Sequence, residues 1–271
     1  MYVKKISITT YRNFGEPAFE LSLKPFTLIL GENNIGKTNL LNALCLIFCQ
    51  ELSVPQSHNL QLDDLNYDTV TRFRKQVADT SLPTDQVVFP EVTVSVVLTD
   101  LNEDQEAVVG DWFCDTELTE AQITYRFSLR ASFDRKKWID EQRQLLAKYI
   151  TPSNAAGTSN NGNTSPSSTS APGNGATPLW QRVEFPIGEY RYLVFGGGRP
   201  TNECDSHFLR MLKVELLDAL RDARQELIAS GEYRLLYRIL RQGHTSRRAR
   251  AYIVCVAARC EGRVLAQLKL T

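Results

Sequence analysis

The residues best suited to chemistry form one run near the N-terminus, Gly31-Glu32-Asn33-Asn34-Ile35-Gly36-Lys37-Thr38. The run has the spacing of a phosphate-binding loop (Walker A), in which four residues separate a glycine from Gly-Lys-Thr. Glycines let the backbone curl so that successive N–H groups point at a polyphosphate, and a following helix adds its positive end. We therefore predict an ATP site, in which Lys37 reaches the β- and γ-phosphates and Thr38 places its hydroxyl on Mg²⁺.

The neighbours of this run supply the elements that a phosphate loop requires. Residues 25–30 form an apolar run suited to a buried strand, and residues 39–48 have the apolar pattern of a helix. A glycine turn that binds nothing is the alternative, because motif matches include false positives. We predict that the nucleotide contacts a continuous set of residues, namely Gly31, Glu32, Asn33, Asn34, Ile35, Gly36, Lys37, Thr38 and Asn39.

Composition sets limits on partners and location. The 271 residues include 31 Lys plus Arg and 31 Asp plus Glu, so overall charge argues neither for nor against a polyanionic partner. The six cysteines contain no Cys-x-x-Cys pair, which argues against a zinc site and fits a reducing cytoplasm. The sequence has neither an apolar signal segment nor a run of about 18 apolar residues. We therefore expect a cytoplasmic protein that does not use a membrane.

Alternating apolar residues predict strands on both sides of the loop. Residues 3–9 and 18–23 indicate two strands joined by a turn, and residues 91–100 and 121–133 indicate two more. Helical patterns cover residues 67–78, 102–112 and 136–149. The sequence therefore predicts an α/β fold with an antiparallel sheet beside the nucleotide core. Two strands ahead of the loop differ from the plainest layout, in which the loop follows the first strand.

A family resemblance begins in these first strands. Ile6, Ile8 and the run Thr10-Tyr11-Arg12-Asn13-Phe14, followed by residues 30–44, resemble the start of ATP-binding-cassette (ABC) heads of the SMC and RecF type. Among these, the chain is most similar to the OLD (overcoming lysogenisation defect) family of ATP-dependent nucleases, over about the first 50 residues. The resemblance implies a P-loop NTPase of ABC-head type with Arg12 near the nucleotide. It also implies head-to-head dimers that sandwich ATP and couple its hydrolysis to a nuclease domain or a DNA transaction.

An acidic residue that would hold Mg²⁺ opposite the loop is harder to find. Asp100 ends an apolar strand as a Walker B aspartate does, but Leu101 stands where a catalytic glutamate is expected. We therefore interpret Asp100 or Asn102 as the cap of the next helix. Three further acids, Asp63, Asp64 and Asp68, lie together, and we interpret them as a solvated loop and helix cap and not as metal ligands.

The later part of the chain divides by composition. We expect an ATP-binding core at 1–150, a disordered Ser, Asn, Gly and Pro insertion at 151–178, a continuation of the same domain at 179–242 and a basic C-terminal tail at 243–271. Within the continuation, residues 180–185 and 189–195 predict a hairpin. A long helix is predicted from Asp205 or Ser206 to about Ser230. Because no strand ends in Asp-Glu, we expect the head to be incomplete.

Two function classes stay open. The favoured one is the Mg-ATP-binding portion of an OLD, RecF or SMC-like ATPase, linked to DNA processing or phage defence and paired with a second copy or a partner head. The alternative is a non-hydrolysing module that docks on DNA or a protein through the arginines of residues 234–263. A P-loop small-molecule kinase is less favoured, because two strands precede the loop. We expect ATP binding with turnover near background, since no water-positioning carboxylate is assigned.

Overall fold

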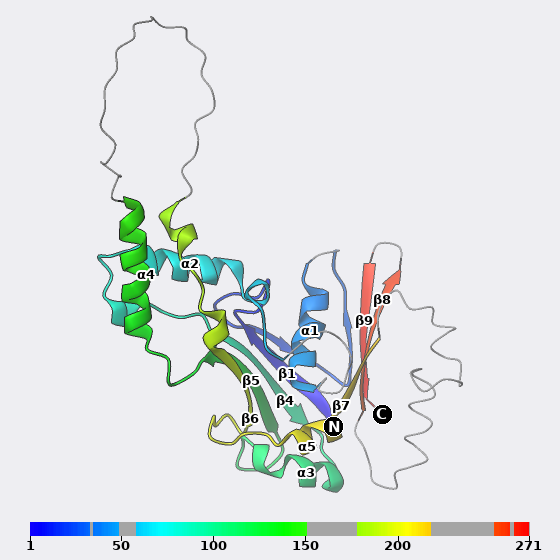
Figure 1. The fold of residues 1–271 in the computed structure, drawn as a ribbon. Coiled ribbons are helices and arrows are strands. Elements are labelled where there is room, and N and C mark those ends of the chain that lie inside the picture. Colours follow the sequence, from blue (N-terminus) through cyan, green and yellow to red (C-terminus); the bar gives the residue numbers. More distant parts are fainter. Residues whose placement is uncertain (33–34, 49–57, 151–177, 218–251, 261–262, 271) are drawn as a thin grey trace, which may run out of the picture.

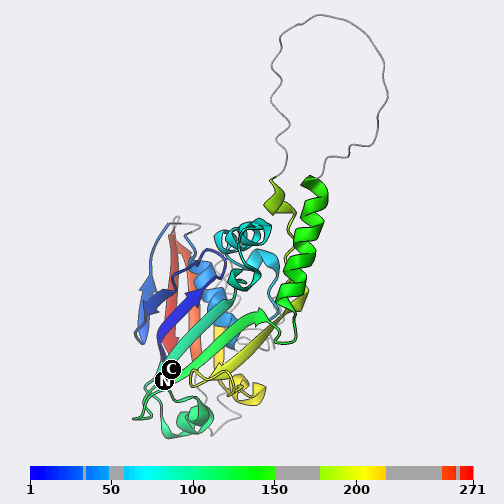
Figure 2. The same cartoon turned by 90° about the vertical axis from the view of Figure 1, so that its left-hand side faces the viewer.

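The computed structural model describes residues 1–32, 35–48, 58–150, 178–217, 252–260 and 263–270. Two β-sheets lie on either side of helix α1 (Lys37–Phe48), as Figure 1 and Figure 2 show. The expected α/β architecture with an antiparallel sheet is confirmed.

The first sheet has five antiparallel strands in the order β2-β1-β4-β5-β6. Their bounds are β1 (Tyr2–Thr9), β2 (Phe19–Ser22), β4 (Val92–Thr99), β5 (Ala121–Leu129) and β6 (Tyr190–Gly196). Alternate residues of β4, namely Val92, Val94, Val96 and Leu98, are fully buried, because successive side chains of a strand point to opposite faces. The strands expected at 3–9, 18–23, 91–100 and 121–133 are confirmed.

The second sheet has the order β3-β9-β8-β7, with β7 and β8 parallel and the other pairs antiparallel. It consists of β3 (Phe26–Ile29), β7 (Lys213–Leu217), β8 (Tyr252–Cys260) and β9 (Arg263–Leu270). The strand expected before the loop is present as β3, but the expectation that it is buried is wrong. Phe26 is 57% exposed and Leu28 48% exposed, because β3 is an edge strand and its other face, with Ile29, is the one that packs against the core.

Helix α1 is the centre of the fold. Every residue from Leu40 to Phe48 is buried, including Cys45. The helix is buried on all sides because it contacts β4 and β5 of the first sheet and β7 of the second. A helix with apolar residues all round is stable only when both sides are covered. The expected helix over 39–48 is confirmed.

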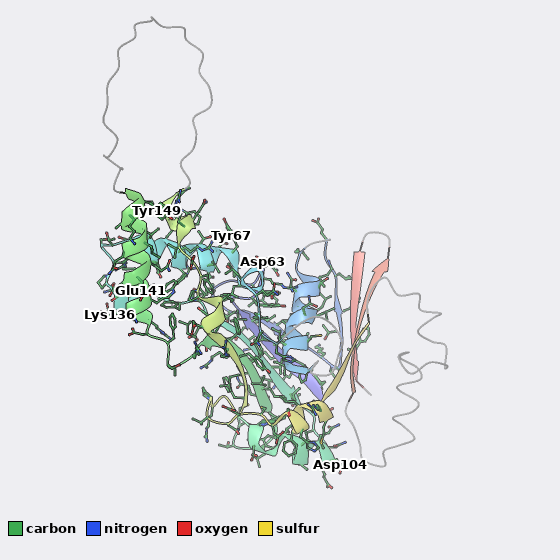
Figure 3. All side chains as sticks on the ribbon, viewed as in Figure 1. Asp63, Tyr67, Asp104, Lys136, Glu141 and Tyr149 are labelled. Atoms are coloured by element: carbon green, nitrogen blue, oxygen red, sulfur yellow. The ribbon has the colours of Figure 1, made fainter. Side chains whose placement is uncertain are left out.

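Helices α2 (Tyr67–Ala78) and α4 (Arg135–Ile150) pack together beside the first sheet, as predicted for these segments. An aromatic cluster joins them, with the ring centroids of Phe73 and Phe89 4.7 Å apart and those of Phe73 and Trp138 6.0 Å apart. The outer side of α4 carries charged residues such as Lys136 and Glu141 (Figure 3). Short 3₁₀ helices complete this region: η1 (Leu62–Asp64), η2 (Thr84–Gln86) and η4 (Leu179–Arg182).

The hairpin expected over residues 180–195 is wrong in its first half. Residues 179–182 form η4, residues 187–189 form η5 (Ile187–Glu189), and β6 alone is a strand. Pro178 and Pro186 precede the two 3₁₀ helices, and proline has no N–H for a sheet ladder. Strand β6 pairs instead with β5, which lies before residues 151–177 in the sequence. A turn follows it, with φ of +63° at Gly197 and +68° at Gly198.

The long helix expected from residue 205 to 230 is also wrong. Helix α5 (Ser206–Met211) begins at the expected cap, since the Asp205 carboxylate accepts a hydrogen bond from the His207 N–H at 2.7 Å. It ends after six residues, and β7 follows, because residues 213–217 pair with β8. Residues 218–230 of that expected helix lie outside the described residues, as does the expected insertion up to residue 177.

The segment expected to be a basic tail contains two strands of the second sheet, β8 and β9. Over the part of the chain that the structure describes, no helix combines the length and apolar character needed to span a bilayer.

Candidate nucleotide-binding site

The glycine loop connects the end of β3 to the start of α1. Gly31, Glu32, Ile35 and Gly36 lie in it, and Lys37 is the first residue of the helix. Asn33 and Asn34 are outside the described residues. The Lys37 side chain is buried, and its Nζ donates hydrogen bonds to the carbonyl oxygens of Gly31, at 2.7 Å, and Glu32. The loop therefore curls around a buried ammonium group at a helix N-terminus.

Gly36 is the residue that this curl depends on. Its φ of +102° lies in a region that residues with a side chain rarely adopt. A Cβ at this position would also lie 2.1 Å from Asn13 Nδ2. The Gly36 carbonyl accepts the first helical hydrogen bond, from the Leu40 N–H at 3.0 Å. Both the backbone and the neighbouring side chain thus require glycine here.

A strained turn after β1 lies against the loop. Thr10 and Arg12 have φ values of +58° and +49°, and a non-glycine residue held in such a region costs about 1–3 kcal/mol. Backbone hydrogen bonds hold the turn: the Phe14 N–H donates to the Tyr11 carbonyl at 2.8 Å, and the Arg12 N–H donates to the Asp64 carbonyl at 2.8 Å. Backbone strain of this kind is common at binding sites. Here the turn places Arg12 and Asn13 within hydrogen-bond distance of Asn39 on α1.

A chain of hydrogen bonds connects this turn to the glycine loop. Arg12 donates from Nε and Nη2 to Asp64 Oδ1, at 3.0 and 2.9 Å, and from Nη1 to Asn39 Oδ1, at 3.0 Å. Asn39 Nδ2 in turn donates to Asn13 Oδ1 at 2.7 Å, and Asn13 Nδ2 lies 3.5 Å from the Ile35 carbonyl oxygen. The structure therefore brings together Arg12, Asn39 and the loop, all of which the sequence analysis selected.

Asp64 is the site residue that sequence reasoning missed. The sequence indicates a solvated loop here, but Asp64 forms an ion pair with Arg12, and the side chains of Asp64 and Arg12 are only 23% and 29% exposed. Its other oxygen, Oδ2, accepts from the Gln61 N–H at 3.1 Å, which fixes the carboxylate. Burial raises the pKa of Tyr11 in this turn to about 12; the Asp64 charge adds to the rise and Arg12 opposes it.

Asp100, one of the two residues expected to cap the next helix, lies far from the loop. Strand β4 pairs with β1 so that Thr93 faces Thr9 and Thr99 faces Tyr2. Asp100 therefore follows β4 at the end of the sheet opposite the Arg12 turn, roughly 20 Å away along the strands. The cap of α3 (Glu103–Val109) is Asn102, whose side chain accepts from the Gln105 N–H at 2.9 Å.

Thr38 is exposed in the first turn of α1, and its hydroxyl group suits Mg²⁺, which prefers oxygen ligands. Within the described ranges, no three His, Cys, Asp or Glu side chains lie close enough together to hold a metal ion. Mg²⁺ commonly takes one or two protein ligands together with phosphate oxygens and water. The residues present thus fit a magnesium ion that arrives with the nucleotide phosphates.

A glycine loop that wraps a buried lysine at the start of a buried helix is typical of P-loop nucleotide-binding domains. Residues 1–168 match the family model of the AAA ATPase domain, and the chain belongs to this family. It is therefore a nucleotide-binding ATPase domain. No curated protein matches the chain.

Proposed function

We propose that ATP binds with Mg²⁺ on residues Gly31–Thr38, with Asn39 and Arg12 beside it. The observation that carries this proposal is the Lys37 ammonium, which is buried within the loop and bonded to the Gly31 carbonyl. When a polyphosphate enters, this ammonium exchanges its carbonyl contacts for the β- and γ-phosphate oxygens. The loop N–H groups and the positive end of α1 stabilise the remaining negative charge.

The finer proposal is an ABC-type head of the OLD, RecF or SMC kind, acting in DNA processing or phage defence. It is supported by the resemblance of residues 6–14 and 30–44, and by the contact of the Arg12 turn with Asn39 behind the loop. A second copy or a partner head, DNA, and coupling to a nuclease domain follow from the same resemblance. A cytoplasmic location is proposed on the cysteine usage; Cys114 and Cys204 are free thiols.

The test is Mg²⁺-dependent ATP binding by calorimetry, together with phosphate release, for the wild-type chain and Lys37→Ala. The matched control is Lys24→Ala, which removes an exposed lysine before β3 and leaves the loop intact. We expect Lys37→Ala to lose ATP binding and Lys24→Ala to retain it. Equal ATP affinity in all three proteins would refute the assignment of the loop.

A second candidate function is a module that binds ATP without appreciable turnover by this chain. It is supported by the position of Asp100, the residue that ends an apolar strand as a Walker B aspartate does, at the end of β4 opposite the Arg12 turn. This candidate predicts ATP-dependent binding to DNA or a protein with phosphate release near background. Robust phosphate release that Lys37→Ala abolishes would exclude it.

A further inference from the structure

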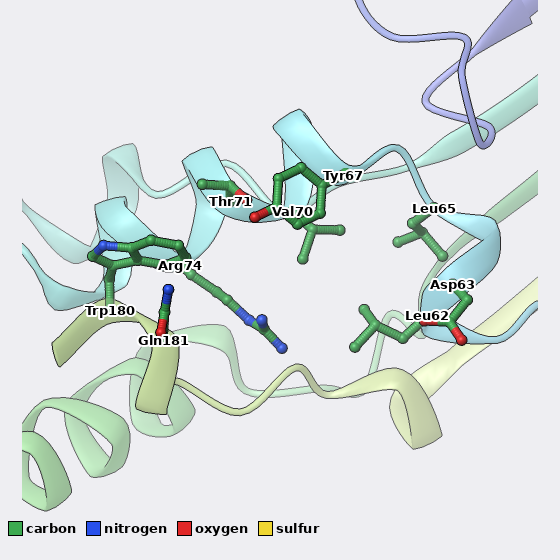
Figure 4. A pocket seen from close by; sticks show the side chains of 9 residues that line it. All are labelled: Leu62, Asp63, Leu65, Tyr67, Val70, Thr71, Arg74, Trp180 and Gln181. Carbon is green, nitrogen blue, oxygen red and sulfur yellow. The ribbon is translucent and has the colours of Figure 1, made fainter. Parts of the chain in front are cut away.

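A second cavity, of about 460 Å³, lies between η1, α2 and η4 and shares no lining residue with the glycine loop (Figure 4). Its volume is in the range of sites for small organic ligands. The polar and aromatic side chains that line it are Asp63, Tyr67, Thr71, Arg74, Trp180 and Gln181. We call it the α2–η4 pocket.

Arg74 is the residue that points to a ligand. Its side chain extends from α2 past Trp180 into the space between η4 and η1 (Figure 4). Its Nε is inaccessible to solvent and has no hydrogen-bond partner. None of the ion pairs among the described residues includes Arg74. A guanidinium donor is costly to leave unpaired, and its fork of N–H groups matches phosphate and carboxylate oxygens. The pocket is therefore suited to an anion.

The other residues that line the pocket indicate which chemical group is attached to the anion. Tyr67 and Trp180 offer aromatic surface for a planar ring, and Lys75 Nζ, 5.5 Å from the centre of the Trp180 ring, adds positive charge at the edge. On the η1 side, the exposed Asp63 carboxylate can only accept hydrogen bonds. It therefore favours a ring that carries an amino group.

We propose that the α2–η4 pocket binds a nucleoside monophosphate whose base carries an amino group. The phosphate pairs with Arg74, the base lies against Tyr67 and Trp180, and its amino group donates to Asp63. This site is separate from the glycine loop and goes beyond the proposed function.

The experiment is calorimetric titration of the Lys37→Ala chain with AMP, so that the glycine loop does not contribute. We expect AMP to bind, and ribose 5-phosphate, which lacks the base, and adenosine, which lacks the phosphate, to bind at least tenfold more weakly. Adding Arg74→Gln should weaken AMP binding about ten- to a hundredfold. The matched control is Arg72→Gln on the same helix, whose exposed arginine pairs with Glu16 outside the pocket, and it should leave AMP affinity unchanged.

A second variant keeps the test independent of folding. Asp63 is exposed, so Asp63→Asn should leave the thermal midpoint unchanged. We expect it to weaken AMP binding and to leave UMP, whose base has no amino group, unaffected, so that the preference for AMP disappears. Folded Arg74→Gln protein that binds AMP as well as its parent overturns the proposal. AMP binding that Lys37→Ala abolishes also overturns it, while it supports the glycine loop as a nucleotide site.

Discussion

Replacing Gly36 by alanine tests the shape of the glycine loop. At φ +102° an alanine costs about 1–3 kcal/mol, and its Cβ would lie 2.1 Å from Asn13 Nδ2. Asn13 must then turn away and lose its 2.7 Å hydrogen bond from Asn39, which costs about 0.5–1.5 kcal/mol more. The sum is about 1.5–4.5 kcal/mol. If the loop relaxes to escape this cost, ATP must restore its shape on binding, and affinity falls by roughly 10- to 2000-fold.

The assay is calorimetric ATP binding beside thermal unfolding, with Asn13→Ala/Gly36→Ala as the second protein. Removing the Asn13 side chain relieves the contact, but the backbone strain stays and the hydrogen bond from Asn39 is still lost, so the double variant should recover little of the affinity. Gly110→Ala is the control, because a Cβ there meets nothing within 4 Å. Unchanged ATP affinity in Gly36→Ala, or complete recovery in the double variant, would refute the reasoning from φ.

Three further changes have defined outcomes. Asp64→Ala should lower the free energy of unfolding by about 1–3 kcal/mol, because its arginine partner keeps a partly buried charge; an unchanged urea midpoint would contradict this. Gly196→Ala places a Cβ 2.1 Å from Trp112 Cδ1 and should cost about 1–3 kcal/mol in thermal unfolding, whereas Gly188→Ala, with nothing within 4 Å, should be neutral. Burial lowers the pKa of His58 from 6.5, so the unfolded chain takes up the proton first and stability falls as pH drops below about 6.5; His58→Phe should reduce that loss.

Local sequence patterns predicted the elements around the site well. In residues 67–78 apolar residues recur with the period of a helix, and α2 has these bounds. The helix is capped by Asn66, whose side chain accepts a hydrogen bond from the Thr69 N–H at 3.2 Å. Strand β4 was predicted equally well, because the alternation of apolar residues that indicates a strand can be recognised within the segment itself. The loop and its flanking strand and helix were also found, since their spacing is itself the signal.

Contacts between distant residues were not predictable in this way. Arg12 and Asp64 are 52 positions apart, and nothing in the local pattern of Asp64 distinguishes an ion-pair partner from a loop residue. The leucines near residue 216 fit a helix and a strand equally well, and pairing of β7 with β8 decided between them. The close approach of Asn13 to Gly36 is likewise a property of the assembled fold.

The pairing of β3 with β9 also has a consequence for how the chain is made. The strand that leads into the glycine loop has one sheet partner among the described strands, and Phe26 pairs with Lys269, more than two hundred residues later in the sequence. Contacts so distant in sequence form late in folding, because closing a long segment costs entropy before any pairing is gained. A ribosome therefore exposes the loop long before residues 263–270 emerge to hold its strand. Nucleotide binding by a nascent chain would report the moment at which β9 has docked on β3.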